Sequence, residues 1–309
     1  MNQNRGSEET QEIQDSSQSN HDSSRSSRST WARWKKPLII TLVAVAALNG
    51  ADSIVAMNTE RRFSNELRET ANLPTAPYAG FGGAAYTASL LTGTVTSISV
   101  RAGDIEVPGF GLVSVESGAS DVELDRHGVL TGEFHDAPAK KFFTKLQLDG
   151  IALGRLMGFT DLVVQNIDDI SPIGGWETEA LLEATLPGDS APTQVAVELR
   201  VRQGVVHITP YEVVSLPDPD ASDLDSTLDS ATEDYVPANP EDLDEATRNR
   251  IFDAFTLNLS GEELPLSMSP TRVFVSGGSI FIEAEKIHAV INPEDFLPVA
   301  ATSEEFEAK

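Results

Sequence analysis

Several stretches of the chain alternate apolar and polar residues with a period of two. In the clearest of them, Val195, Val197, Leu199 and Val201 are separated by smaller or charged residues, and stretches 96–101 and 105–107 follow the same rule. Such alternation is typical of strands with one covered face, and one-sided strands are typical of antiparallel sheets. The chain is therefore predicted to be of class α+β and mostly antiparallel β.

Two short turn sequences connect alternating stretches. Gln203-Gly204 separates the strand that ends at 202 from a second one over 205–209, and Gly277-Gly278 lies between Val273-Phe-Val275 and Ile280-Phe-Ile282. Two-residue connections containing glycine predict tight β-hairpins. Helical spacing interrupts the strands at 151–157.

The first part of the chain has a different character. Residues 1–30 are rich in Ser, Gln, Asn, Asp and Glu and contain almost no large apolar side chains. A segment of this kind cannot bury enough apolar surface to offset the entropy that ordering costs. We expect a disordered tail on the cytoplasmic side.

An apolar run follows this tail. Arg33, Lys35 and Lys36, with two tryptophans, precede residues 37–57, a stretch of 21 residues. About 20 residues span a bilayer, and cations before the span favour a cytoplasmic amino terminus. We therefore expect a single-pass transmembrane anchor over 31–58 in the cell membrane, with the main domain extracytoplasmic. The strictly apolar part is short enough for a signal peptide, but no small-x-small site precedes Asp52, which favours an uncleaved anchor.

A helix is predicted directly after the anchor. Thr59 can cap it, Phe63 and Leu67 lie four residues apart on one face, and Pro74 and Pro77 end it. It leads into a folded domain over 59–298. The remaining residues, 299–309, are expected to form a flexible tail.

An acidic insertion divides the predicted domain. Residues 216–247 contain eleven Asp or Glu, four Pro and no Lys or Arg. Such a stretch is typical of a solvated linker. Strands are expected to resume from 248.

Composition excludes several functions. The formal charge of −26 argues against a nucleic-acid partner, because binding phosphates needs clustered cations. The chain has no cysteine, no His-Glu-x-x-His and no Gly-x-Ser-x-Gly, and the acidic insertion lacks the glycine and glutamate of an EF-hand loop. Only weak, nonspecific calcium association stays open. We expect no metal site, no cofactor and no catalytic residues, so the protein is not expected to be an enzyme.

One basic cluster stands out against this acidic background. Lys140, Lys141 and Lys145 lie in a predicted strand in which Phe142, Thr144 and Leu146 share the opposite face from Lys141 and Lys145. On the helical stretch that follows, Arg155 is accompanied by apolar residues, which are Leu153, Leu156, Met157 and Phe159. A cationic rim beside an apolar surface suits an anionic amphiphile. The alternative is an ordinary solvated strand face with a core side.

The order of these features resembles the actinobacterial LmeA-like phospholipid-binding family over roughly residues 37–292. The residues that carry the resemblance are Ala51-Asp52, Glu60-Arg-Arg62, Phe81 to Gly93, 95–100, 148–153, Gly158 with Asp161, 205–210 and Leu264-Pro-Leu266. The chain departs from the family's pattern in lacking a proline before Leu90 and in its long acidic insertion.

The resemblance implies a curved sheet that wraps a helix around an apolar groove, similar to tubular lipid-binding domains. It also implies binding of phospholipid of phosphoinositide type and a role in the assembly of envelope glycolipids. With the anchor and the lysine cluster added, we expect a protein that binds anionic or phosphoinositide-type phospholipid at the outer leaflet. Two alternatives remain. One is a non-catalytic envelope scaffold or interaction protein, and the other is a glycolipid enzyme that depends on paired carboxylates.

The predicted orientation can be tested on whole cells. Protease added to intact, wall-stripped cells should remove residues 59–309 and spare the amino-terminal tail, because Arg33, Lys35 and Lys36 hold that tail in the cytoplasm. Immunoblots against both ends of the chain follow the cleavage. A large domain that survives the protease would contradict the orientation.

Overall fold

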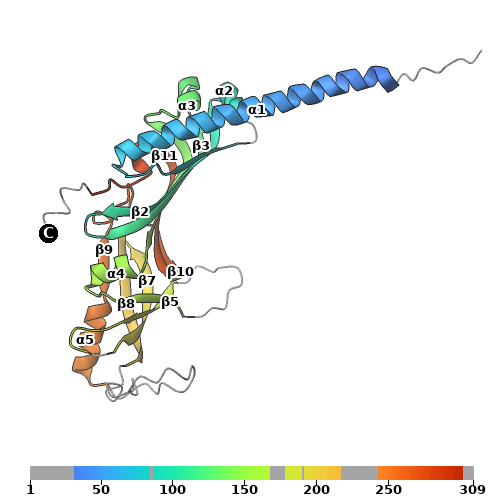
Figure 1. Ribbon diagram of the computed structural model, residues 1–309. Helices are drawn as coiled ribbons and strands as arrows, with labels where there is room; N and C mark the ends of the chain where they lie inside the picture. The colour runs from blue at the N-terminus through green and yellow to red at the C-terminus, as the bar shows by residue number, and fades with distance from the viewer. Residues whose placement is uncertain (1–30, 84–85, 168–177, 190, 217–242, 302–309) are drawn as a thin grey trace, which may run out of the picture. The chain divides into compact units, whose positions relative to one another are not determined.

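The computed structural model describes residues 31–83, 86–167, 178–189, 191–216 and 243–301 (Figure 1). The chain divides into two units, 1–48 and 49–309. Helix α1 (Trp31–Thr70) supplies the described part of the first unit and continues into the second. All of the other helices and strands belong to the second unit.

Helix α1 confirms one predicted face and corrects two boundaries. Phe63 and Leu67 are buried, as their spacing predicts. Thr59 does not cap a helix; it lies inside α1, and its Oγ1 is 3.1 Å from the carbonyl oxygens of Val129 and Leu130. Asp52, placed in the anchor by the sequence, accepts hydrogen bonds from the backbone N–H groups of Tyr86 and Thr87 and so belongs to the folded unit.

Within the part of the chain that the structure describes, no helix is both long enough and apolar enough to cross a bilayer. The transmembrane anchor predicted for 31–58 is therefore not shown. Near the end of this segment, Val55 and Ala56 pack against the core of the domain.

Two antiparallel sheets form the second unit, which confirms the predicted fold class. The first sheet has the order β1-β2-β3-β4-β11-β10 and the second β5-β6-β7-β8-β9. The strands of the first sheet are β1 (Tyr78–Gly82), β2 (Thr94–Val107), β3 (Gly111–Glu123), β4 (Ala137–Leu148), β10 (Arg272–Ser276) and β11 (Ser279–Ile291). Those of the second are β5 (Val163–Asn166), β6 (Glu179–Ala184), β7 (Thr193–Arg202), β8 (Val205–Ser215) and β9 (Leu257–Ser260).

Both predicted hairpins are present. Gln203 and Gly204 join β7 to β8 with φ angles of 53° and 77°, and Gly277 and Gly278 join β10 to β11 with 55° and 78°. Two successive positive φ values are the signature of a type I′ turn, whose twist matches that of the flanking strands.

In the first sheet, the alternation of buried and exposed residues shifts by one residue at a row of neighbouring positions that crosses four strands. On one side of the row the buried residues are the mutually paired Ile98, Ala119 and Phe142; on the other they are Val95, Val122, Ala139 and Ala289. On β2, β3 and β4 two successive residues face outward between these buried ones, and on β11 the exposed run is Lys286, Ile287 and His288. Across this row the pairing register between neighbouring strands stays the same. Asp121 and His288, which belong to this row, have φ angles of 48° and 53°, and the ladder pairs that would join them to Lys140 are absent. The first sheet is curved (Figure 1), and this interruption, together with the bulge between Ala102 and Ile105 of β2, is of the kind that bends strands.

An aromatic cluster fills the inner face of this sheet beneath α1. The Phe63 ring lies 5.3 Å from Phe81, 5.5 Å from Phe134 and 5.6 Å from Phe296, and Phe296 lies 5.2 Å from Phe142. Tilted and edge-to-face contacts of this kind add stability beyond the burial of apolar area. The cluster joins α1, β1, β4 and the C-terminal segment in one core.

Short helices complete the unit. They are α2 (Ser89–Thr92), α3 (Arg126–Thr131), α4 (Gly150–Met157) and α5 (Glu245–Phe255), with the 3₁₀ turns η1 (Tyr86–Ala88) and η4 (Pro293–Asp295). Helix α4, predicted over 151–157, is confirmed; Asp149 caps it by accepting from the Ala152 N–H. Helix α5 packs against β8 of the second sheet. The ring of its Phe255 lies 4.8 Å from that of Phe159, which follows α4.

Helix α5 corrects the interpretation of the acidic insertion and of the strands expected from 248. Residues 217–242 lie outside the described part of the chain, but Asp244 caps α5 by accepting from the Thr247 N–H at 2.6 Å. The helix forms because Ile251 and Phe255, four residues apart, both bury their side chains. The strands resume only at Leu257.

The predicted flexible tail also begins too early. Ala300 is buried and its N–H donates to the Ala71 carbonyl, while the Ala301 N–H donates to the Glu106 carbonyl. The chain up to 301 is therefore part of the folded unit.

Two loop replacements should separate the insertion from the cap of α5. Exchanging 218–242 for a short Gly/Ser linker should leave the melting temperature unchanged, because eleven like charges and four prolines in 216–247 oppose a packed core. Exchanging 218–246 also removes Asp244 and should cost about 1 kcal/mol, or roughly 2–4 °C. Scanning calorimetry measures both. An equal loss from the two replacements would show that 218–242 packs against the domain.

Candidate functional site

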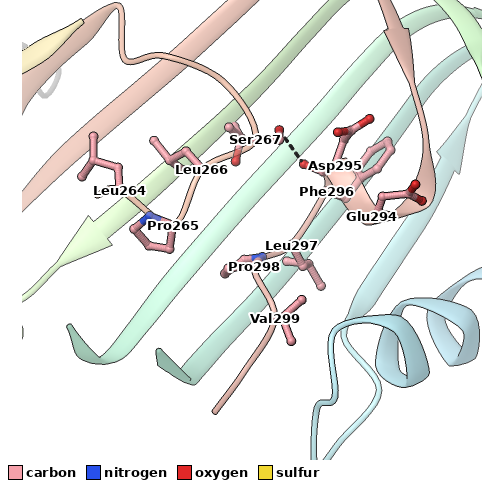
Figure 2. Close-up of a pocket in the computed structure, with 11 residues that line it drawn as sticks. Leu264, Pro265, Leu266, Ser267, Glu294, Asp295, Phe296, Leu297, Pro298 and Val299 are labelled. Carbon is pink, nitrogen blue, oxygen red and sulfur yellow. Dashed lines mark hydrogen bonds between the residues drawn. The ribbon is translucent and has the colours of Figure 1, made fainter. Parts of the chain in front are cut away.

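A pocket of about 350 Å³ opens on the inner face of the first sheet. One wall is the loop Leu264–Ser267 and the other is the C-terminal segment Glu294–Val299, and the two face each other across the opening (Figure 2). Thr144 of β4 also lines it. Leucine, proline, valine and phenylalanine side chains supply most of the lining residues, so the pocket can hold an apolar group.

A buried polar contact fixes one wall to the sheet. The Ser117 Oγ lies 2.8 Å from the Thr144 Oγ1 and 2.6 Å from the Phe296 carbonyl oxygen, and both hydroxyl side chains are buried. A buried hydroxyl costs free energy unless it is hydrogen-bonded, so this arrangement positions the C-terminal segment over β4.

The second wall is held at its rim. The Ser267 hydroxyl donates to the Asp295 carbonyl at 3.0 Å (Figure 2), and an Asp295 carboxylate oxygen accepts from the Asn292 N–H at 2.8 Å. Glu294 and Asp295 are the charged residues among those that line the pocket, and no Lys, Arg or His lines it. In the described ranges, no group of three or more His, Cys, Asp or Glu is arranged to hold a metal ion.

The predicted lysine cluster lies on the opposite face of the same sheet. Phe142, Thr144 and Leu146 are buried on the inner side of β4, as predicted, and Lys141 and Lys145 point outward. Strict alternation would turn Lys140 inward. The phase change of the sheet instead brings it outward, where its side chain is 69% exposed.

Each of these lysines has an acidic partner. Lys140 pairs with Asp121 at 3.3 Å, Lys141 with Glu285 at 2.8 Å and Lys145 with Glu116 at 2.7 Å. Exposed pairs of this kind contribute little to stability, but they cancel most of the local positive charge. The outer face is therefore a mixed surface, with a hollow of about 310 Å³ beside Lys140 and His288.

Lys145 belongs to the best-connected of these pairs. Glu116 accepts from Lys145 and also from Arg101, whose Nη2 lies 2.9 Å from it. Burial raises the pKa of Glu116, but the hydrogen bonds and positive charges of Lys145 and Arg101 outweigh burial and hold this pKa below its usual value of 4.5.

The other predicted site residues are divided between surface and core. Arg155 is exposed, lies 3.7 Å from Glu106, and lines a separate hollow of about 130 Å³ with Ile151 and Leu112. Leu153 and Phe159 are buried in the core, whereas Leu156 and Met157 are partly buried. The structure therefore does not bring these residues together with the lysines into a single cavity.

A sequence profile of the LmeA-like phospholipid-binding family matches residues 50–285, well over half of the chain. The chain belongs to this family. Neither a curated protein nor a solved structure matches it. The LmeA-like match begins next to Asp52 and so covers the part of α1 that packs on the domain.

Sequence reasoning missed the pocket itself. Leu264-Pro-Leu266, which carried part of the LmeA-like resemblance, forms one wall, but nothing in its spacing indicates what it faces. The other wall, Phe296-Leu-Pro-Val299, was split between the domain and the predicted tail. Its signal was the concentration of apolar residues after the last strand.

The contact between Lys145 and Glu116 makes a prediction about pH. The folded-state pKa of Glu116 is lowered, so its contribution to stability is present above pH 4.5 and is lost as the pH falls through the lowered pKa. Lys145→Gln should raise the pKa of Glu116, as measured by an NMR titration of its side-chain carboxyl carbon. The difference in melting temperature from wild type should be largest near neutral pH and should shrink below pH 4.5. Lys140→Gln, which leaves Glu116 untouched, is the matched control, and an unchanged Glu116 titration in Lys145→Gln would contradict the assignment.

Proposed function

We propose that this protein binds a phospholipid and holds acyl-chain carbon in the pocket between Leu264–Ser267 and Glu294–Val299. The observation that carries the proposal is an apolar pocket on the inner face of the sheet in a member of a family described as phospholipid-binding. Its volume, about 350 Å³, lies in the range of pockets that bind small ligands.

An acyl chain can enter the pocket only if one of its walls moves, and the two walls are held by different kinds of contact. The Ser267–Asp295 hydrogen bond is an exposed contact between the two walls, whereas the Ser117–Phe296 contact behind it is buried. Exposed contacts open at lower free energy than buried ones. The loop wall is thus the wall that yields to an entering chain, and the C-terminal wall stays on the sheet.

We propose binding without turnover. The support is the family's description, which names binding, together with the composition of the pocket, whose lining pairs no histidine with a nucleophile. The envelope scaffold and the carboxylate-dependent glycolipid enzyme are the alternatives that the experiment below distinguishes.

The place of action belongs to the same proposal. The cations and tryptophans before residue 37, and the apolar residues after it, support attachment at a cell membrane with the domain at the outer leaflet. A contribution to envelope glycolipid assembly rests on the resemblance to the LmeA-like family alone. Attraction of the outer lysine face to anionic or phosphoinositide-type lipid is supported by Lys140, Lys141 and Lys145, whose pairing with carboxylates limits its strength.

Lipid that co-purifies with the full chain tests the pocket. Val299, 63% exposed at the pocket wall, is changed to Asp, and Val163, 45% exposed on the edge strand β5, is changed to Asp as the matched control. A carboxylate facing an acyl chain loses its hydration, so Val299→Asp should lower bound phospholipid about tenfold, while Val163→Asp should retain it. Native mass spectrometry counts the lipid carried by each variant.

The remaining outcomes choose among the alternatives. Wild type that carries no lipid would favour the scaffold. Hydrolysed or transferred lipid that accumulates with time would favour the enzyme. Equal losses in both variants would exclude this pocket as the binding site.

A further inference from the structure

We infer that the pocket selects lipids whose head group carries an ammonium group over lipids whose head group has a net negative charge. This inference rests on the proposed function and names the class of ligand for the same pocket. It also distinguishes the lipid bound in the pocket from the anionic membrane surface that the lysine cluster is predicted to contact.

The charge at the rim is negative. Glu294 and Asp295 are among the residues that line the pocket, and both belong to its C-terminal wall (Figure 2). No Lys, Arg or His is among the residues that line it. A phosphate left at the rim by a lipid whose chain is in the pocket would meet two carboxylates and no cation of the lining.

One further carboxylate, that of Glu66 on α1, is coupled electrostatically to Glu294. Glu66 of α1 interacts electrostatically with Glu133 and Glu294, and with His135 as a counter-charge. Burial, followed by the charge of Glu133, raises the pKa of Glu66 above its usual value of 4.5, and Glu294 adds to the effect. Glu294 is thus one of the charges that Glu66 meets, with a smaller effect than burial, Glu133 or His135.

The sheet keeps the lysines away from the rim. Thr144 lines the pocket from the inner face of β4, whereas Lys141 and Lys145 extend from the outer face of the same strand. Their ammonium groups are bound to Glu285 and Glu116 on that side. The lysines that the sequence analysis predicted to bind the lipid head group therefore do not line the pocket proposed to hold the acyl chain.

The size of the preference follows from Coulomb's law. Two carboxylates a few ångströms from a head group, in a partly hydrated and screened opening, should change relative affinity roughly three- to tenfold. The same two carboxylates attract an ammonium group and repel a phosphate whose charge no cation of the head group neutralises.

A competition experiment measures this preference. The full chain, freed of lipid in detergent, is mixed with equimolar phosphatidylethanolamine and phosphatidylglycerol that have the same acyl chains, and native mass spectrometry gives the ratio of the two bound lipids. Wild type should favour phosphatidylethanolamine by roughly three- to tenfold. Glu294→Gln should move the ratio toward one, and Glu294→Lys should reverse it.

Glu212→Gln is the matched control. Glu212 is exposed on β8 and does not line the pocket, and its substitution changes the net charge by the same amount as Glu294→Gln. It should leave the ratio unchanged. A wild-type ratio of one or below would overturn the inference, as would a ratio that Glu294→Gln does not change or that Glu212→Gln changes equally. If neither lipid binds, the proposed function itself fails. Thermal melts confirm that each variant is folded.

Discussion

Four neighbouring strands of the first sheet change the phase of their alternation along the same row, and much of the structure depends on this event. Because β2, β3, β4 and β11 change together, the pairing register between neighbouring strands is the same on both sides of the row, and the buried faces there remain continuous. Left-handed Asp121 and His288 absorb the backbone change. The ladder pairs are missing along this row of the sheet, and the inner face of the same sheet packs against part of α1.

The curved inner face has two kinds of occupant. Toward α1 it is filled by aromatic rings, with Phe63 in contact with Phe81, Phe134 and Phe296. Elsewhere, loop Leu264–Ser267 and the C-terminal segment cover it incompletely and leave the pocket. Phe296 takes part in both regions, since its ring belongs to the aromatic cluster and its residue lines the pocket. Packing of α1 and the shape of the pocket are coupled through this residue.

The same sheet separates two electrostatic environments. On the outer face, lysines and carboxylates alternate across β3, β4 and β11 and largely neutralise one another, as Lys145, Arg101 and Glu116 illustrate. On the inner face, the pocket's charged residues are acidic. A lipid held in the pocket and a bilayer that approaches the outer face would therefore experience different fields, although both contact the same strand.

The sequence by itself determined the local elements. Period-two alternation defined the strands, the turns Gln203-Gly204 and Gly277-Gly278 fixed two hairpins, and the spacing of Phe63 and Leu67 identified the buried face of α1, because each of these signals lies within a few residues. Only the tertiary structure decided that Lys140 points outward, that each lysine has a carboxylate partner, and that Leu264–Ser267 faces Glu294–Val299 to form a pocket. These features join segments far apart in the chain, and their geometry depends on sheet register and curvature, which no local pattern encodes.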